Sequence, residues 1–384
     1  MIVRYTALCP MVFGDGAING VGEEVKALGC TRVLLLSDTI TARQPAYATC
    51  QNSLLNVGIE VVEYPNCLPD PPDHIVIEAS KLANAEKVDG LVAFGGGSVI
   101  DTAKAVKVLM NNPLPMAQYY GNYNYKPGVP LTAIPTTAGT GSETTRYAVI
   151  SDSQLVQKKS FYVHADLGIL DPEITASMPP QVTASTGMDA FSHSAEALTS
   201  QTANPHSDLL GSDSIRRIVQ YLPLAVADGA NHQARREMMI ASNFAGSAFN
   251  DAPTHLGHSI AQTLGAHQHV THGVACALAL PEVMVFAAGI VPEKVRMIGE
   301  AMGLSIPRDA DNQAIGAQVA KAIRTFMKGI QIPSLKALGL SREDTVKVAP
   351  YVFNEASMLR VPDGVSLTEA QMESILGAVY DNYQ

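Results

Sequence analysis

Along the first part of the chain, hydrophobic and polar positions form two kinds of pattern: short apolar runs and segments with helical spacing of apolar residues. Short apolar runs, each as long as a buried parallel strand, occur at 31–37, 59–64, 90–94 and 131–135. Segments with helical spacing of apolar residues lie between or beside them, at 16–28, 47–56, 74–86 and 95–110. This alternation predicts a doubly wound α/β domain of the Rossmann-like, dinucleotide-binding kind.

This alternation of strand and helix patterns ends after 167–180, a segment that contains the Asp171-Pro172 turn and the Pro179-Pro180 pair. Strand-like runs largely disappear beyond it, and helical periodicity dominates. Helices are predicted at 181–199, 205–221, 233–249, 257–264, 273–286, 292–302, 314–329 and 367–380. We therefore expect a dinucleotide-binding α/β domain at 1–180 and an all-α metal-binding and substrate domain at 181–384, with the active site in the cleft between them.

No stretch has the pattern of a membrane segment. The longest apolar run, 274–291, is interrupted by Pro281 and Glu282, which predicts a buried helix followed by a break. The first residues lack the charged region and long apolar core of a signal peptide. These features predict a soluble, cytoplasmic protein that binds no membrane.

Composition narrows the classes of partner. The 384 residues are 47% hydrophobic and 16% charged, enough for a large core and two domains. The net charge of -10, with Lys and Arg dispersed, argues against nucleic acid as a partner. Five widely spaced cysteines without a CxxC pair indicate neither a disulfide framework nor a thiolate zinc site, which fits a reducing cytoplasm.

A candidate metal site begins in TGMDAFSHSAEALT, residues 186–199. Asp189 and His193 stand four residues apart, so a helix places them on one face. Alone, such a pair is also typical of a helix surface or a helix start. His258 and His272 follow in a predominantly apolar stretch, where solvated polar faces are not expected. One Asp and three His offer nitrogen and oxygen ligands to a divalent transition metal.

A glycine-rich loop follows the strand at 90–94. It reads GGGSVIDTAKAVKVLM from Gly95 through Gly96 and Gly97, and Ser98 with Asp101 resembles a helix capping box. Free backbone N–H groups at such a helix start bind a pyrophosphate well. The spacing is not GxGxxG, so a glycine turn with a cap and no ligand is the alternative.

A second polar loop follows the strand at 131–135. Its residues 136–145 read TTAGTGSETT, and the hydroxyl groups and small side chains suit contacts to phosphate, ribose or nicotinamide. The residues of interest are Thr136, Thr137, Ala138, Gly139 and Thr140.

Asp38 ends the first apolar run and is a candidate acceptor for the adenosine ribose hydroxyls, although here the acid precedes the glycine loop. A negative charge there would repel the extra phosphate of NADP, which favours NAD. The alternative is a helix cap or turn former.

The chain resembles the iron-dependent (group III) alcohol dehydrogenase family, in its branch of lactaldehyde reductase and 1,3-propanediol dehydrogenase. The resemblance runs over essentially the whole length, through FGDGAI, GGGSVIDTAKAV, AIPTTAGTGSETT, LDPEIT, TGMDAFSHSAEAL and THGVACALALP. It implies that Asp189, His193, His258 and His272 are metal ligands, and that Asp38, Gly97, Ser98, Asp101 and Thr136 to Thr140 bind the cofactor. It also implies a cofactor contact for Lys159, although the segment before Asp171 is about four residues shorter than in lactaldehyde reductase.

The chain departs from the family pattern at a few positions. Gln262 stands where lactaldehyde reductase has a second His, four residues after the third ligand, and Asp70 and Thr271 replace a usual Asn and a common Pro. No side chain is an obvious general base. Gln262 and His267 are the candidates for shaping the pocket or relaying a proton, and His267 and His269 have pocket lining or structure as their alternative roles.

The resemblance implies an NAD-dependent enzyme that transfers a hydride between NAD(H) and a small primary alcohol, diol or aldehyde, with Fe2+ as metal and a homo-oligomer, a dimer or higher, as assembly. Ligand types alone also permit Zn2+, Co2+ or Ni2+. The alternatives are a glycerol dehydrogenase-like zinc polyol oxidoreductase and, in a different class, a non-catalytic nucleotide- and metal-binding protein. The complete set of four ligands speaks against the latter and against the metal-independent maleylacetate reductases.

Overall fold

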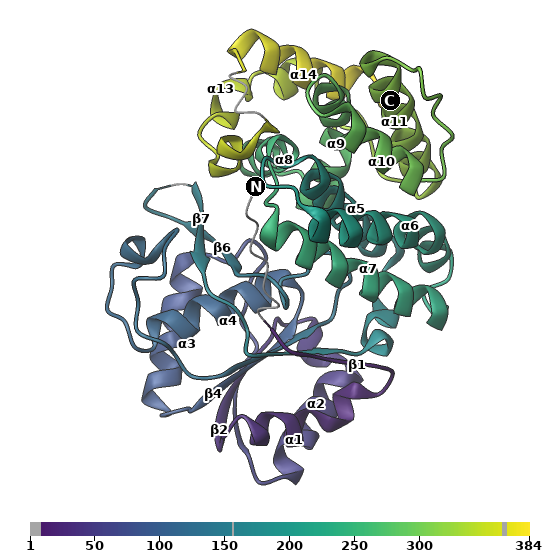
Figure 1. Ribbon diagram of the computed structural model, residues 1–384. Coiled ribbons are helices and arrows are strands. Elements are labelled where there is room, and N and C mark those ends of the chain that lie inside the picture. Colours follow the sequence, from purple (N-terminus) through teal and green to yellow (C-terminus); the bar gives the residue numbers. More distant parts are fainter. Residues whose placement is uncertain (1–8, 156, 363–366) are drawn as a thin grey trace. The chain divides into compact units, whose positions relative to one another are not determined.

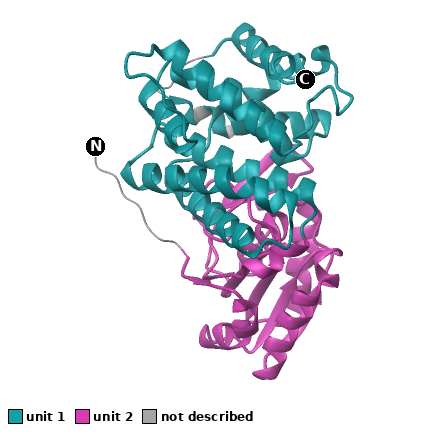
Figure 2. Cartoon of the chain, turned by 90° about the vertical axis from the view of Figure 1, so that its right-hand side faces the viewer, with its two compact units in different colours: residues 1–5, 178–384 teal, residues 6–177 magenta. Residues whose placement is uncertain are grey.

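The chain forms two compact units, which differ in fold class (Figure 2). The computed structural model describes residues 9–155, 157–362 and 367–384. The α/β unit (unit 2, magenta in Figure 2) ends at Ser177, and the residues from Met178 onward form the helical unit (unit 1, teal). The prediction about a signal peptide concerns in part residues 1–8, which lie outside the described residues.

The α/β unit is built on a six-stranded sheet with the order β1-β8-β5-β4-β2-β3. Its strands are β1 (Met11–Phe13), β2 (Arg32–Leu36), β3 (Glu60–Tyr64), β4 (Gly90–Gly95), β5 (Leu131–Pro135) and β8 (Leu167–Leu170). Every neighbouring pair runs parallel. A parallel sheet needs helical crossovers, and these cover both of its faces.

Two hydrophobic cores sandwich this sheet (Figure 1). The covering helices are α1 (Val21–Ala27), α2 (Pro45–Asn56), α3 (Asp73–Ala85) and α4 (Gly97–Leu109). Leu34 and Leu36 of β2 pack with α3 and α4, whereas Val33 and Leu35 pack with α1 and α2. Successive side chains of a strand point to opposite faces, so a continuous apolar run fills both cores. The doubly wound prediction is confirmed.

The strand order reverses between β2 and β4. After β2 the chain moves outward to β3, then returns across β2 to pair β4 with its other edge. Ligands of open α/β sheets bind beyond the carboxyl ends of strands at such a reversal. Asp38 follows β2 closely, and Gly96 and Gly97 follow β4, so the topology places both candidate cofactor segments there.

The sequence pattern missed four strands. β1 and β8 are three and four residues long, too short for a periodicity to register. β6 (Tyr147–Asp152) and β7 (Gln157–Tyr162) pair as an antiparallel hairpin in a separate two-stranded sheet. Ser, Asp, Gln and Lys residues interrupt both strands, so the hairpin lacks the long apolar run that marks a buried strand.

The unit from Met178 onward consists of helices in the part that the structure describes, as predicted. They are α5 (Pro180–Thr199), α6 (Pro205–Ala227), α7 (His232–Asp251), α8 (Leu256–Gln268), α9 (His272–Ala288), α10 (Pro292–Ala301), α11 (Asn312–Gly329), α12 (Arg342–Val346), α13 (Ala349–Val352) and α14 (Glu369–Asp381). Proline occupies the first position of α5, α6 and α10, where its missing N–H costs nothing.

Pro281 and Glu282 do not interrupt the helix that was predicted at 273–286. Helix α9 continues through Pro281 to Ala288, and it packs against α5, α8, α11 and α14. Proline inside a helix costs about 3 kcal/mol, and burial of the surrounding apolar residues offsets that cost. No helix within the described residues has both the length and the apolar character needed to cross a membrane.

Candidate metal centre and cofactor loops

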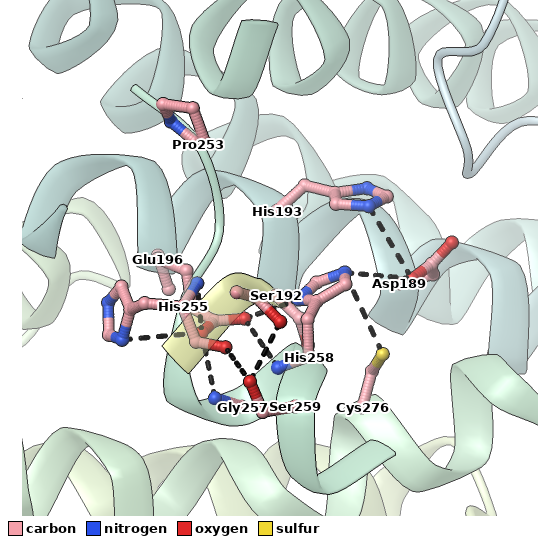
Figure 3. A network of polar contacts seen from close by, with 12 residues as sticks. Asp189, Ser192, His193, Glu196, Pro253, His255, Gly257, His258, Ser259 and Cys276 are labelled. Atoms are coloured by element: carbon pink, nitrogen blue, oxygen red, sulfur yellow. Dashed lines mark hydrogen bonds and ion pairs between the residues drawn. The ribbon is translucent and has the colours of Figure 1, made fainter. Parts of the chain in front are cut away.

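Three imidazoles converge on one carboxylate oxygen, and Figure 3 shows two of them, those of His193 and His258, with their contacts to Asp189. Asp189 and His193 lie one turn apart on α5, His258 comes from α8, and His272 is the first residue of α9. Their Nε2 atoms lie 3.8, 3.8 and 3.6 Å from Oδ1 of Asp189 for His193, His258 and His272 respectively. The structure thus brings together the four residues that the sequence singled out.

These donors fit a metal ion. Oδ1 of Asp189 is buried and has no hydrogen-bond partner among the described residues, which would be costly unless a cation meets it. Bond lengths of about 2.0–2.2 Å to nitrogen and oxygen place two donors of one tetrahedral ion about 3.4 Å apart, close to the observed separations. The tightest group comprises Asp189, His258, His272 and Cys276, whose ligand atoms all lie within 4.8 Å of one another. His193 adjoins this group through Asp189 and by stacking on His258 at 4.7 Å between ring centroids.

Glu196 holds His258 from behind (Figure 3). Its Oε1 accepts hydrogen bonds from the backbone N–H groups of His255 at 3.0 Å and Gly257 at 2.8 Å. Its Oε2 accepts from the backbone N–H of His258 at 3.1 Å and bonds to Nδ1 of the same residue. Because an ionised carboxylate only accepts, Nδ1 of His258 carries the proton and Nε2 presents its lone pair to the site.

The electrostatics of the cluster keep both acids ionised. Burial alone raises the pKa of Asp189, but the charges of His193, His272 and His258 outweigh it, and the pKa falls below its ordinary value. Burial likewise opposes ionisation of Glu196, yet His258 and His255 lower its pKa to about 2. Burial lowers the pKa of His258, and Glu196 more than reverses that effect. Two buried negative charges beside imidazoles favour a cation.

Sequence reasoning missed Glu196 and Cys276. Glu196 stands seven residues after Asp189 and three after His193, so helical spacing places it near the same face. Cys276 stands four residues after His272 on α9. Both spacings were visible in the sequence.

The glycine loop, residues 95–97, packs tightly against the polar loop at 136–145, which we call the threonine loop. Thr136 N–H donates to the carbonyl of Gly95 at 3.0 Å, as expected from the pairing of Gly95 with Pro135. A Cβ on Gly97 would lie 2.7 Å from Cγ2 of Thr140, and one on Gly95 would lie 2.4 Å from Val99. These glycines are therefore required by close packing.

The predicted capping box of Ser98 and Asp101 is wrong. Helix α4 begins at Gly97 after Gly96, with no side-chain cap, and Ser98 lies inside the helix. The first N–H groups of α4 therefore have no capping side chain, which suits a bound phosphate.

Asp101 anchors the threonine loop from below. Its Oδ1 accepts from Ser142 Oγ at 2.5 Å and its Oδ2 from Val149 N–H at 2.9 Å. The buried Lys104 donates to the carbonyls of Thr145 at 2.8 Å and Tyr147 at 2.7 Å. Both oxygens of Asp101 are thus engaged within the protein, which indicates that it positions the loop.

Asp38 forms a tight turn after β2. Its Oδ1 accepts from the N–H groups of Ile40 and Thr41 at 2.8 and 2.9 Å, and Oδ2 accepts from Thr41 Oγ1 at 2.9 Å. This is the turn-forming role weighed as the alternative. The same bonds fix the carboxylate at the strand reversal, and its oxygens have further lone pairs for ribose hydroxyls.

Lys158 and the predicted Lys159, neighbours on β7, interact with different groups. Nζ of Lys158 pairs with Oδ1 of Asp70 at 2.7 Å, and its charge acts on Asp101. Lys159 points to the other face of β7 and acts on Asp152. Neighbouring lysines on a strand face opposite ways, and only the paired register distinguishes them.

The two proton-relay candidates differ in position. Gln262 is half-buried and lies one turn after His258 on α8. His267 is exposed and stacks on Tyr351 at 4.2 Å between ring centroids. Nine residues separate it from His258, roughly 14 Å along the helix. This places His267 in surface packing, and Gln262 remains the candidate near the metal ligands.

Comparisons with known proteins identify the family. Residues 10–172 match the model of the iron-containing alcohol dehydrogenase family, and residues 183–380 match that of the C-terminal region of Fe-containing alcohol dehydrogenases. The chain therefore belongs to the iron-containing alcohol dehydrogenase family, and it is an oxidoreductase of alcohols and aldehydes. The predicted family and the predicted enzyme class are both confirmed.

Individual relatives cover most of the chain. It is 37% identical over 335 residues to a choline dehydrogenase of Bacillus subtilis (85% of this chain, 83% of the relative). It is 34% identical over 349 residues to an NAD-dependent methanol dehydrogenase of Bacillus methanolicus (90% and 91%). The crystal structure of a 1,3-propanediol oxidoreductase superposes with a TM-score of 0.94 at 31% identity, covering 99% of this chain and 100% of that chain.

Proposed function

We propose that this chain transfers a hydride between NAD(H) and a small primary alcohol, diol or aldehyde, with Asp189, His193, His258 and His272 holding Fe2+. The observation that carries the proposal is the convergence of three imidazole Nε2 atoms on Oδ1 of Asp189. Its substrate class follows from the relatives, which are named for choline, methanol and 1,3-propanediol. These differ in size and charge but share an alcohol group.

Once bound, Fe2+ supplies a Lewis acid for the substrate oxygen, and the nicotinamide gives or takes the hydride. The protein's own contribution is to arrange the donors. Glu196 fixes the tautomer of His258, with its proton on Nδ1 and its lone pair on Nε2. Asp189, 3% exposed, offers its carboxylate where little water competes for it. Gln262 is the candidate to contact the substrate, since it lies one turn from His258.

The cofactor would lie at the strand reversal of the α/β unit. The first N–H groups of α4 would bind its pyrophosphate, and Thr136 to Thr140 would contact the remaining polar groups. Asp38 would accept from the ribose hydroxyls and disfavour NADP. We assign the lysine contact to Lys158 in place of Lys159, because the charge of Lys158 reaches Asp101.

Two further expectations accompany this function. All five cysteines lie in the described part of the chain. Each is buried and none forms a disulfide bond with another cysteine, which supports a reducing, cytoplasmic location. The family resemblance supports a homo-oligomer, a dimer or higher.

The test joins catalysis to metal content. The purified protein should oxidise NADH with small aldehydes and contain about one metal ion per chain. His272→Ala should lower metal content and turnover together, turnover by about 100-fold or more, because Lewis-acid stabilisation is worth several kcal/mol. His74→Ala, which alters an exposed imidazole of the α/β unit, should change neither. Full turnover in a variant that holds no measurable metal would refute the proposal.

A further inference from the structure

Cys276 lies among the proposed metal ligands (Figure 3). It follows His272 by one turn of α9, so both side chains lie on one face of the helix. Its Sγ is 3.6 Å from Nε2 of His272 and 3.9 Å from Nε2 of His258. With 1% of its surface exposed, it meets these polar groups without solvent between them.

The other cysteines have a different environment. Cys9 and Cys67 pack in one hydrophobic core of the α/β unit, and Cys30 and Cys50 pack in the other. Burial raises the pKa of the Cys50 and Cys67 thiols to about 12, as expected for small apolar side chains that carry no chemistry. Cys276 instead has two imidazole nitrogens and a carboxylate as neighbours.

The donor distances suit a shared ion. Metal bonds of about 2.3 Å to sulfur and 2.0–2.1 Å to nitrogen place two neighbouring donors of one ion about 3.1–3.8 Å apart, for angles between the bonds of about 90–120°. The observed separations of 3.6 and 3.9 Å from Sγ to the two Nε2 atoms are close to this range. Independently, the buried Oδ1 of Asp189 has no hydrogen-bond partner within the part of the chain that the structure describes, and Asp189 belongs to the same group of donors as Cys276.

We propose that Cys276 is a direct sulfur ligand of the metal ion, as a fifth protein donor beside Asp189, His193, His258 and His272. The proposal rests on the metal centre of the proposed function. As the sulfur–metal bond forms, the thiol proton leaves for solvent. A soft sulfur donor favours Zn2+ and Co2+ over Fe2+ relative to a site of only oxygen and nitrogen. Cys276 thereby becomes a determinant of metal choice.

The experiment uses the full-length protein loaded with Co2+ in place of its own metal. Direct sulfur ligation gives an intense sulfur-to-cobalt charge-transfer band in the near ultraviolet, which oxygen and nitrogen ligands do not give. The native protein should show this band at one bound Co2+ per chain. Cys276→Ser and Cys276→Ala should lose it and bind Co2+ and Zn2+ about 10-fold or more weakly, since losses outside the ligand set already cost 10–100-fold.

Cys67→Ala is the matched control, a buried cysteine of the other unit, and it should keep the band. A native protein that binds one Co2+ without the band overturns the role of Cys276 and leaves the proposed function intact. A native protein that binds no Co2+, Zn2+ or Fe2+ overturns both. Because the native spectrum alone decides the ligation, the test holds even if a Cys276 variant fails to fold.

Discussion

At the scale of single residues, Glu196 determines which nitrogen of His258 faces the metal centre. All three backbone N–H groups around the start of α8 donate to its oxygens, as does Nδ1 of His258. The carboxylate therefore organises the helix start and the imidazole together. Its buried charge is balanced because His255 and His258 surround it.

Replacing Glu196 with Gln tests this role. If the amide oxygen keeps the bonds from His255 and Gly257, its NH2 group faces the N–H and Nδ1 of His258, where only an acceptor fits. His258 must then move its proton to Nε2, which removes the lone pair from the metal. We expect Glu196→Gln to weaken metal affinity by about 10–100-fold while the fold persists.

Metal content after dialysis against graded chelator, with circular dichroism of the same samples, measures this effect. Glu373→Gln, which changes an exposed acid of α14, should bind metal as the native protein does. Equal metal affinity in Glu196→Gln and the native protein would show that Glu196 has only a structural role.

The residues of the site differ in how visible they are in sequence. Asp189 and His193 could be predicted because helical spacing links them directly, and His258 and His272 because an imidazole in an apolar stretch is conspicuous. Cys276 could not, because thiolate sites are recognised by paired cysteines, whereas this one lies beside His272 of its own helix and His258 of another helix. Its proposed ligand role depends on how α8 and α9 pack, which no local pattern contains.

At the scale of elements, the buried Lys104 connects α4 to the threonine loop through hydrogen bonds to Ser142 and Thr145. The strand β4, the glycine loop and the strand β5 could be predicted, since each is a local pattern. The hairpin of β6 and β7 could not be predicted. Its backbone nevertheless bonds to helix α4, because the carbonyl of Tyr147 accepts from Lys104 and the N–H of Val149 donates to Asp101. The loop is thus held by long-range contacts that the sequence did not reveal.

Lys104 predicts a pH dependence of stability. Burial lowers its pKa from 10.5 to about 8, an effect that Asp101 and Glu143 only partly oppose. Between these two values the unfolded chain binds a proton that the folded protein releases, so stability rises with pH in that window. Below about pH 8 both states are protonated, and the folded state has the full cost of the buried charge.

Urea unfolding of metal-free protein from pH 7 to pH 10 measures this dependence. Relative to Lys104→Met, whose side chain cannot titrate, the native protein should gain stability steadily above about pH 8. Lys336→Met, which changes an exposed lysine, should follow the native profile. A difference between the native protein and Lys104→Met that stays constant across this range would contradict the lowered pKa.

At the scale of the whole molecule, the two proposed binding sites belong to separate units. The glycine and threonine loops lie in the α/β unit, and the metal ligands lie in the helical unit. The change in hydrophobic periodicity along the sequence indicated two domains, because parallel sheets and helical bundles have different periodicities. The cleft predicted between them concerns how the units meet, and it stays a prediction.

Separate units predict separable binding. His258→Ala should lose the metal while NADH binding is retained, because its ligand set shares no residue with the cofactor loops. Gly97→Ala should do the reverse, since the new methyl group would lie 2.7 Å from Thr140 and displace the threonine loop from the helix start. We expect its NADH affinity to fall about 10-fold or more, equivalent to ~1.4 kcal/mol, with metal content unchanged. Fluorescence titration with NADH and metal analysis on both variants give the four values needed. Loss of both ligands in either variant would mean that the two units do not bind independently.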